Sequence, residues 1–267
     1  MRIRVLCVGD VVGSPGRRAI ADILPELTKT AGINCSIVNA ENIASGSGLT
    51  PNLYDKLLRS GVNLITLGDH IYRRREIIPV LETSTQLVRP ANLPSTAPGH
   101  EFAVFETESG YSVAVFALLG RLFMKTQVDC PFRAAERVLS RIPSHVKVIV
   151  ADIHAEATSE KIAMGWFLDG KVSLLFGTHT HVATADERIL PGGTGYITDL
   201  GMTGPHDSVL GRRKENVLQY LLTSIPTRFD VAENDNRLNG VLADIDSDNG
   251  RCVAIERVSL SGPTTSD

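Results

Sequence analysis

The chain has 267 residues, of which 43% are hydrophobic and 21% charged, and its formal net charge is −3. This composition is typical of a globular protein and excludes a disordered chain. No apolar stretch is long enough to predict a transmembrane helix, and the small negative charge gives no general attraction to nucleic acid. Residues 1–8 indicate a first strand rather than a leader, because Asp10 follows at once without a small-residue cleavage site. We therefore expect a cytoplasmic protein without a membrane partner, built as a single domain over residues 1–260 with a tail over 261–267.

The first third of the chain predicts three successive strand–loop–helix units. Apolar runs predict strands over residues 2–9, 36–40 and 63–67, and amphipathic stretches predict helices over 17–31, 52–60 and 74–81. Each strand is followed by a carboxylate, namely Asp10, Glu41 and Asp69. Open α/β folds build their sites at the carboxyl edge of parallel strands. These three side chains should therefore converge.

The remainder of the chain predicts a second sheet. Hairpin strands are expected over 103–107 with 111–117 and over 240–246 with 252–259, apolar strands over 146–151 and 172–176, a helix over 132–142, and loops over 192–196 and 201–205. The second hairpin turn contains Asn249-Gly250, a pair that favours positive φ at both positions. The pattern predicts a mixed α/β class, and helices outside two packed sheets would form a four-layer αββα sandwich.

Histidines follow the two central strands of this second part. The segment Gly177-Thr178-His179-Thr180-His181 places two imidazoles after one strand, and His154 follows the strand before it. Alternate histidines at a strand edge can simply be solvated, so this pair alone is a weak signal. Carboxylates and imidazoles delivered by several strand ends are harder to explain by packing, because buried charges cost several kcal/mol unless they are paired or bind metal. The predicted metal ligands are Asp10, Glu41, Asp69, His154, His179 and His181.

Six donors exceed one tetrahedral set, which indicates two metal ions with a bridging carboxylate. Nitrogen and oxygen ligands without a thiolate suit iron or manganese, with zinc or magnesium as alternatives, and divalent or mixed-valence pairs are both compatible with them. Two ions about 3.5–4 Å apart can bind a phosphoryl group and lower the pKa of a bridging water. The sequence thus predicts a hydrolase that cleaves phosphoesters by attack of a metal-bridging hydroxide.

Several motifs resemble the YmdB-like branch of the calcineurin-like metallophosphoesterases over nearly the whole chain. They are Gly9-Asp10-Val-Val-Gly13, Asn39-Ala-Glu41-Asn42, Leu67-Gly-Asp-His70, Asp152-Ile-His154-Ala-Glu156-Ala-Thr-Ser-Glu160-Lys161, Gly177 to Val182, Pro191-Gly-Gly193 and Asp199-Leu-Gly-Met-Thr-Gly-Pro205. The resemblance implies the αββα sandwich, a bacterial phosphodiesterase acting on 2′,3′-cyclic nucleotides or an RNA-derived substrate, a regulatory role in RNA metabolism, and a homo-oligomer that is a dimer or tetramer.

The resemblance also implies individual roles. Asp10, Glu41 and His181 would hold one ion, and Glu41, Asp69, His154 and His179 the other, with Glu41 as the bridge. Asn42 would bind the phosphate or complete a metal shell, and His70 would be the general acid. Asn42 could instead cap the following turn, and His70 could orient another residue. His206 is a further candidate for substrate binding from a loop that borders the site.

Asp69 departs from the family pattern, which has Asn at this position. A carboxylate there neutralises more of the charge of two cations than an amide would. We expect Asp69 to hold metal more tightly, to attract an anionic phosphate less, or to favour a more highly charged ion such as ferric iron.

Other interpretations of the sequence stay open. The same site could serve a phosphomonoesterase or a nuclease, which would differ in loops. The chain could also be a metal-stabilised RNA-binding regulatory protein with weak activity, with the basic clusters 73–75 and 212–214 as the RNA contact. Residues 156–161 are interpreted as a helix start in which Thr158 and Glu160 supply capping bonds.

Overall fold

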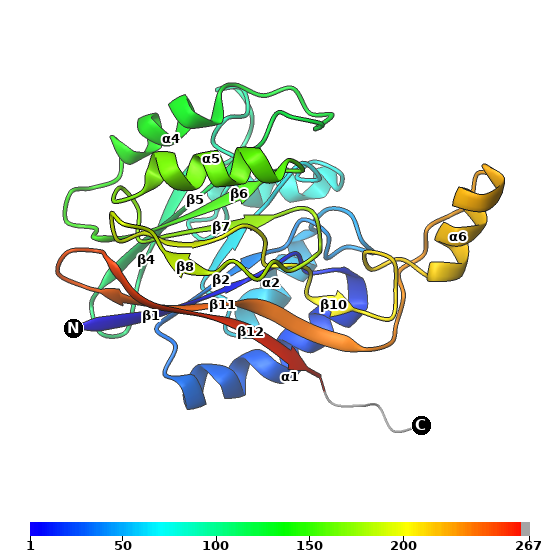
Figure 1. The fold of residues 1–267 in the computed structure, drawn as a ribbon, viewed down its shortest axis with the longest axis horizontal. Coiled ribbons are helices and arrows are strands. Elements are labelled where there is room, and N and C mark those ends of the chain that lie inside the picture. Colours follow the sequence, from blue (N-terminus) through cyan, green and yellow to red (C-terminus); the bar gives the residue numbers. More distant parts are fainter. Residues whose placement is uncertain (263–267) are drawn as a thin grey trace.

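The computed structural model describes residues 1–262 and contains two six-stranded sheets (Figure 1). The first sheet has the order β10-β11-β1-β2-β3, and β12 pairs with β11. Its strands are β1 (Arg2–Val8), β2 (Cys35–Asn39), β3 (Leu64–Thr66), β10 (Gly204–Pro205), β11 (Asn236–Asp246) and β12 (Cys252–Ser261). Strands β1, β2 and β3 are parallel, and β11 runs antiparallel to β1.

The second sheet has the order β4-β5-β6-β7-β9-β8. Its strands are β4 (Phe102–Glu106), β5 (Ser112–Leu119), β6 (Val148–His154), β7 (Leu174–Thr178), β8 (Arg188–Ile189) and β9 (Gly195–Ile197). The four inner strands β5, β6, β7 and β9 are parallel, and the edge strands β4 and β8 are antiparallel to their neighbours.

Helices cover the outer face of each sheet, which confirms the predicted αββα sandwich (Figure 1). The first sheet is covered by α1 (Gly13–Ala31), α2 (Pro51–Arg59) and α3 (Ile78–Thr83), which follows the 3-10 turn η1 (Arg75–Ile77). The second is covered by α4 (Pro131–Leu139) and α5 (Thr158–Leu168). A sixth helix, α6 (Lys214–Thr223), lies away from the sandwich. None of the helices in residues 1–262 combines the length and apolar composition needed to cross a bilayer.

Burial on both faces explains why the central strands are continuously apolar. In β1, Val5 and Cys7 pack between the two sheets, whereas Leu6 and Val8 pack beneath the helices of the first sheet. Strands buried on both faces lose the alternation of apolar and polar residues that marks a half-exposed sheet. Because each central strand is buried along its length, polar residues begin only where the strand leaves the core at the edge of the sheet.

Several local predictions were wrong. Helix α1 begins at Gly13 rather than residue 17, because Pro15 fits within a first helical turn. The loop predicted over 192–196 overlaps the start of β9, the loop predicted over 201–205 contains β10, and α6 was not predicted. In the turn between β11 and β12, Gly250 has positive φ but Asn249 does not, so the turn is longer than the two-residue type. The predicted tail begins inside β12, since Ser261 is its last residue, and 263–267 lie outside the described residues.

Candidate metal centre

The six predicted metal ligands lie where the carboxyl ends of five parallel strands from both sheets meet. They are Asp10 after β1, Glu41 after β2, Asp69 after β3, His154 at the end of β6, and His179 and His181 after β7. The first sheet supplies the three carboxylates of the site, and the second sheet supplies the three imidazoles. These side chains therefore converge, as the sequence predicted.

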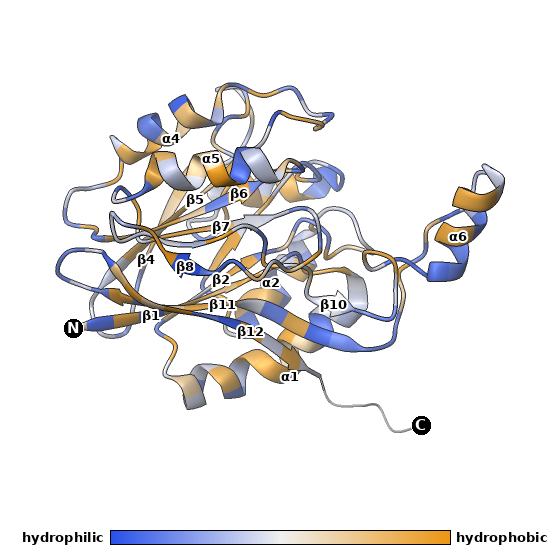
Figure 2. Cartoon of the chain, viewed as in Figure 1, coloured by the Kyte–Doolittle hydropathy of each residue, from blue (hydrophilic) through white to orange (hydrophobic). Residues whose placement is uncertain are grey.

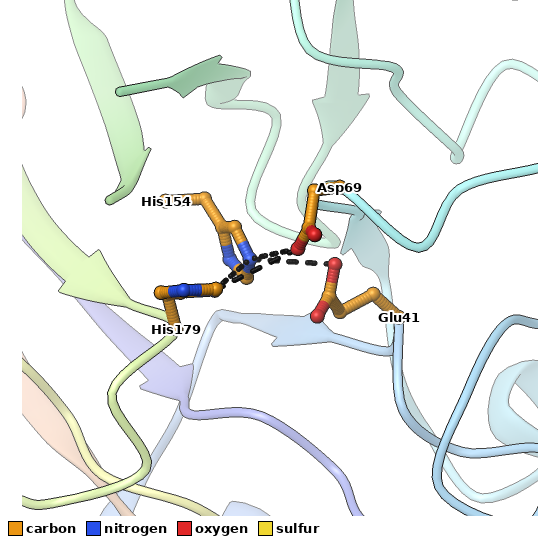
Figure 3. A group of neighbouring side chains, drawn as sticks. All are labelled: Glu41, Asp69, His154 and His179. Carbon is orange, nitrogen blue, oxygen red and sulfur yellow. Dashed lines mark hydrogen bonds and ion pairs between the residues drawn. The ribbon is translucent and has the colours of Figure 1, made fainter. Parts of the chain in front are cut away.

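Four of these side chains form one tight group (Figure 3). Glu41, Asp69, His154 and His179 each direct one donor atom to within 4.8 Å of the others. His154 Nε2 lies 3.2 Å from Asp69 Oδ1 and 3.3 Å from Glu41 Oε2, and 3.0 Å from His179 Nδ1. Two oxygens and two nitrogens without a thiolate suit iron, manganese or zinc.

A second set of donors lies beside Glu41. His181 Nε2 is 3.8 Å from Asp10 Oδ1 and 3.1 Å from the Asn42 amide nitrogen. That amide nitrogen also donates to Glu41 Oε1 at 3.0 Å. The two oxygens of Glu41 therefore face different sets, one towards His154 and the other towards Asn42. This is the arrangement that a bridging carboxylate needs.

The buried carboxylates of this site lack enough positive charge of their own. Asp10 is fully buried, its Oδ1 has no hydrogen-bond partner among the described residues, and burial raises its pKa to about 6. Burial would also raise the pKa of Glu41, but the imidazoles of His154 and His70 hold that pKa well below its ordinary value. An unpartnered buried oxygen is costly, so a cation beside Asp10 fits the residues present.

Each of the three histidines has one ring nitrogen that contacts a group outside the predicted ligand set. His154 Nδ1 lies 2.8 Å from Thr178 Oγ1, His181 Nδ1 donates to the Leu210 carbonyl at 3.1 Å, and His179 Nε2 lies 3.3 Å from Glu156 Oε2. Histidines that bind metal almost always donate their other ring N–H in this way, which fixes the tautomer. The remaining nitrogen of each ring faces the carboxylates.

His154 is oriented by a relay of buried groups that ends on Asp152. Thr178 donates its hydroxyl hydrogen to Asp152 Oδ1 at 2.7 Å, so its oxygen accepts from His154 Nδ1. Asp152 Oδ2 accepts from Thr66 at 2.6 Å and from Asn39 at 3.0 Å. Burial raises the pKa of Asp152, and His154 and these neutral donors offset only part of the effect. The relay engages His154 Nδ1 and leaves Nε2 as the ring nitrogen that faces Glu41 and Asp69.

The segment that carries His179 and His181 has a strained backbone. Their φ angles are 96° and 65°, and such values cost about 1–3 kcal/mol for a residue other than glycine. Between them, Thr180 donates its hydroxyl to Asp199 at 2.8 Å. Asp199 is buried and also pairs with the buried Lys161 at 2.6 Å. This ion pair therefore holds the two histidines in place.

His70 and Asn42 lie together at the rim of the site. His70 Nδ1 donates to Asn42 Oδ1 at 2.8 Å, and the hydrogen bond to Glu41 raises the pKa of His70. His70 Nε2 is left 4.0 Å from Asp69 Oδ2. Asn42 thus contacts Glu41, His181 and His70, and these contacts are more than a turn cap would make.

His206 lies apart from this group. Its Nε2 accepts from the Asn239 amide at 3.1 Å, and burial lowers its pKa. It lines, together with His181, a cavity of about 380 Å³ that also includes Leu200 and Met202. His206 therefore shares a cavity with His181, and its ring hydrogen-bonds to Asn239 rather than to another candidate among the described residues.

Sequence reasoning missed the supporting residues. The helix start predicted within residues 156–161 is confirmed, since α5 begins at Thr158, but the capping bonds are absent: α5 has no side-chain cap, and Glu160 instead accepts from the backbone of Arg121 at 2.8 Å. Lys161 is buried against Asp199. Both the lysine and Asp152 stand inside motifs that mark the family, but only the fold shows which ligand each one supports.

Replacing Thr178 by valine should weaken metal binding. The change removes the hydroxyl between His154 and Asp152 and leaves the shape of the side chain similar, so His154 loses its orientation. We expect the affinity for Mn²⁺ to fall about 10–100-fold, as is usual for loss of such a partner. Isothermal titration of the metal-free protein measures this affinity.

Thr66→Val is the matched control for this experiment. Thr66 is equally buried and donates to the same carboxylate, but it does not contact His154. Its Mn²⁺ affinity should stay at the wild-type value. Equal losses in the two variants would contradict the relay and indicate a general effect on Asp152.

Comparisons with known proteins agree with this geometry. Residues 6–258 match the family model described as "YmdB-like protein". A 2′,3′-cyclic-nucleotide 2′-phosphodiesterase of Bacillus subtilis (strain 168) is 44% identical over 259 residues, which cover 97% of each chain.

Two solved structures share the whole fold. A hypothetical protein from Thermus thermophilus is 39% identical with a TM-score of 0.90, covering 98% of this chain and 100% of that one. A structure described as a novel phosphatase, from Mycoplasma pneumoniae, is 33% identical with a TM-score of 0.91, covering 98% and 94%. By its motifs, its fold and the length of the match, this chain belongs to the YmdB-like protein family.

Proposed function

We propose that this protein is a phosphodiesterase with two metal ions that hydrolyses 2′,3′-cyclic nucleotides or related small phosphodiesters. The observation that carries the proposal is the position of Glu41, whose two oxygens face two different sets of donors. The name of the Bacillus relative supports the choice of substrate. A cytoplasmic location for one domain spanning residues 1–260 fits such a substrate.

One ion would be held by Asp10, Glu41 and His181, and the other by Glu41, Asp69, His154 and His179. Iron and manganese suit this donor set best, with zinc and magnesium as alternatives. Such a pair of ions supplies a strongly nucleophilic water at neutral pH and positive charge for the phosphoryl oxygens. The protein's own part is to hold these donors in the correct tautomers and to exclude bulk water from the buried carboxylates.

His70 would protonate the leaving oxygen. Its Nδ1–H is engaged by Asn42, so a protonated ring presents Nε2–H on the side of Asp69. His70 is only partly buried, with 28% of its side chain exposed, which leaves it within reach of a substrate. The ribose oxygen of a cyclic nucleotide is a poor leaving group and gains from such a proton.

The basic cluster 212–214 makes local contacts, which weakens the alternative of an RNA-binding scaffold. Arg212 donates to the carbonyls of Gly46, Ser45 and Phe229. Arg213 pairs with Glu233 and Lys214 with Asp207. These cations therefore serve local contacts, and we retain hydrolysis as the proposed function. A phosphomonoesterase or nuclease would use the same donors and differ in the substrate accepted.

Glu41→Gln should abolish the activity. The amide offers one acceptor oxygen in place of two and removes a charge from between the ions. We expect kcat/KM for 2′,3′-cyclic AMP to fall by about three orders of magnitude or more, because the metal-activated water contributes several kcal/mol. Steady-state kinetics at saturating Mn²⁺ measure this loss. The exposed Glu76→Gln is the control, and wild-type activity in Glu41→Gln would refute the proposal.

His70→Ala should distinguish a general acid from an orienting residue. With 2′,3′-cyclic AMP we expect kcat to fall about 10²–10⁴-fold. With bis(p-nitrophenyl) phosphate we expect less than about a tenfold loss, because p-nitrophenolate departs without a proton. Equal losses on the two substrates would show that His70 positions other groups.

Asp69→Asn should lower KM and loosen the metal. The amide removes one negative charge, so the site attracts an anionic phosphate more strongly but holds its cations less tightly. KM for 2′,3′-cyclic AMP and metal content after dialysis are the two measurements. If neither changes, the charge of Asp69 has no part in binding.

A further inference from the structure

A cavity of about 370 Å³ lies between α1 and α2, the helices that cover the outer face of the first sheet. Its floor is apolar, because Ile43 and Leu57 belong to the core beneath these helices and Leu53 packs against the same core. Sites for small ligands have volumes of roughly 300–1,000 Å³, apolar walls and a few polar groups. None of the six predicted metal ligands lines this cavity, so it is separate from the candidate metal centre.

Cations surround this apolar floor. Arg17 and Arg18 come from α1, and Lys56 and Arg59 come from α2. Among the described residues, Asp22 is the one carboxylate that lines the cavity. None of the four cations forms an ion pair with a carboxylate within residues 1–262. The cavity therefore has an excess of positive charge that the chain does not compensate.

Helix periodicity gathers these cations on the two facing surfaces. The lining residues recur at 14, 17, 18 and 21 on α1 and at 53, 56 and 57 on α2, a spacing that places them on one face of each helix. Figure 2 shows hydrophilic and hydrophobic residues alternating along α1, whose other face is buried through Ile20 and Leu24. Like charges brought together in this way repel each other, and an anion between the helices would relieve that repulsion.

The two arginines of α1 retain free donors. Arg17 is partly buried, and its Nη1 donates to the Ile43 carbonyl at 2.8 Å. Burial, and then the charge of Arg18, lower the pKa of Arg17. Arg18 Nη1 donates to Ser14 Oγ at 3.2 Å. Each guanidinium has five N–H donors in a planar fork that matches the geometry of a phosphate, so most of these donors stay available to a ligand.

We propose that this cavity binds a small organic phosphate of the nucleoside monophosphate class. Arginine and lysine side chains bind the phosphate dianion, and the apolar floor together with the flat face of a guanidinium accommodates a planar base. A cavity of this volume suits one such ligand rather than a folded partner. The proposal does not rest on hydrolysis at the metal centre.

The test compares the binding of 5′-AMP to Mn²⁺-loaded wild type and to Arg18→Ala/Lys56→Ala by equilibrium dialysis. Arg17 is left in place because it supports the Ile43 carbonyl. We expect wild type to have a 5′-AMP site whose dissociation constant rises at least tenfold in the double variant, because two charge-assisted contacts are lost. Any 5′-AMP held at the metal centre would stay equal in both proteins. Unchanged Mn²⁺ affinity and circular dichroism establish that the metal centre and the fold are intact.

Lys29→Ala/Arg133→Ala is the matched control, since it also removes one exposed lysine and one exposed arginine from helices but from outside the cavity. Its 5′-AMP binding should equal that of wild type. Equal 5′-AMP binding by wild type and Arg18→Ala/Lys56→Ala, or an equal loss in the control, would overturn the proposal.

Two further ligands test the assignment to a nucleotide. Inorganic phosphate and ribose 5-phosphate should bind wild type at least tenfold more weakly than 5′-AMP, because they lack the base that covers the apolar floor. Inorganic phosphate that binds as tightly as 5′-AMP would overturn the nucleotide assignment. Binding of an oligoribonucleotide without binding of 5′-AMP would also overturn it and assign the cavity to RNA.

Discussion

The site depends on two buried carboxylates, with a third that is partly exposed beside them, at the junction of two sheets. Asp10 and Glu41 are withdrawn from water almost completely, and Asp69 lies beside them. Buried anions cost several kcal/mol each unless cations or hydrogen bonds compensate them. The fold supplies imidazoles at the required positions, but Asp10 Oδ1 still lacks a partner among the described residues. Metal cations at this site would compensate the cluster, and their binding would then contribute to the stability of the fold.

Two further buried carboxylates position the histidines, and the fold compensates each differently. Asp152 is surrounded by neutral donors, two hydroxyls and an amide, so it can accept through Thr178 and polarise His154. Asp199 is paired with Lys161, which cancels its charge. Asp199 therefore fixes the strained segment between His179 and His181 without adding to the negative potential of the site. Both residues order the site, but only Asp152 adds negative charge to it.

The sequence predicted the architecture and the convergence of the candidate ligands because both follow from local patterns. Continuous apolar runs mark strands buried on both faces, and the polar residue after each run marks the edge where they meet. The pairing of Lys161 with Asp199 could not be predicted in this way, because it joins a helix to a loop that is distant in the chain. The turn at Asn249-Gly250 and the start of α1 depend on backbone geometry that several sequences can satisfy. His206 follows β10 and shares a cavity with His181, but its ring bonds to Asn239, and this pairing joins residues that are distant in the chain.

The residues between β10 and α6 connect this projecting helix to the candidate metal centre. Leu210 offers its carbonyl to His181 Nδ1, and Arg212 binds the carbonyls of Ser45 and Gly46 in the loop that follows Glu41. The same segment therefore sets the tautomer of one histidine and supports the loop of the bridging carboxylate.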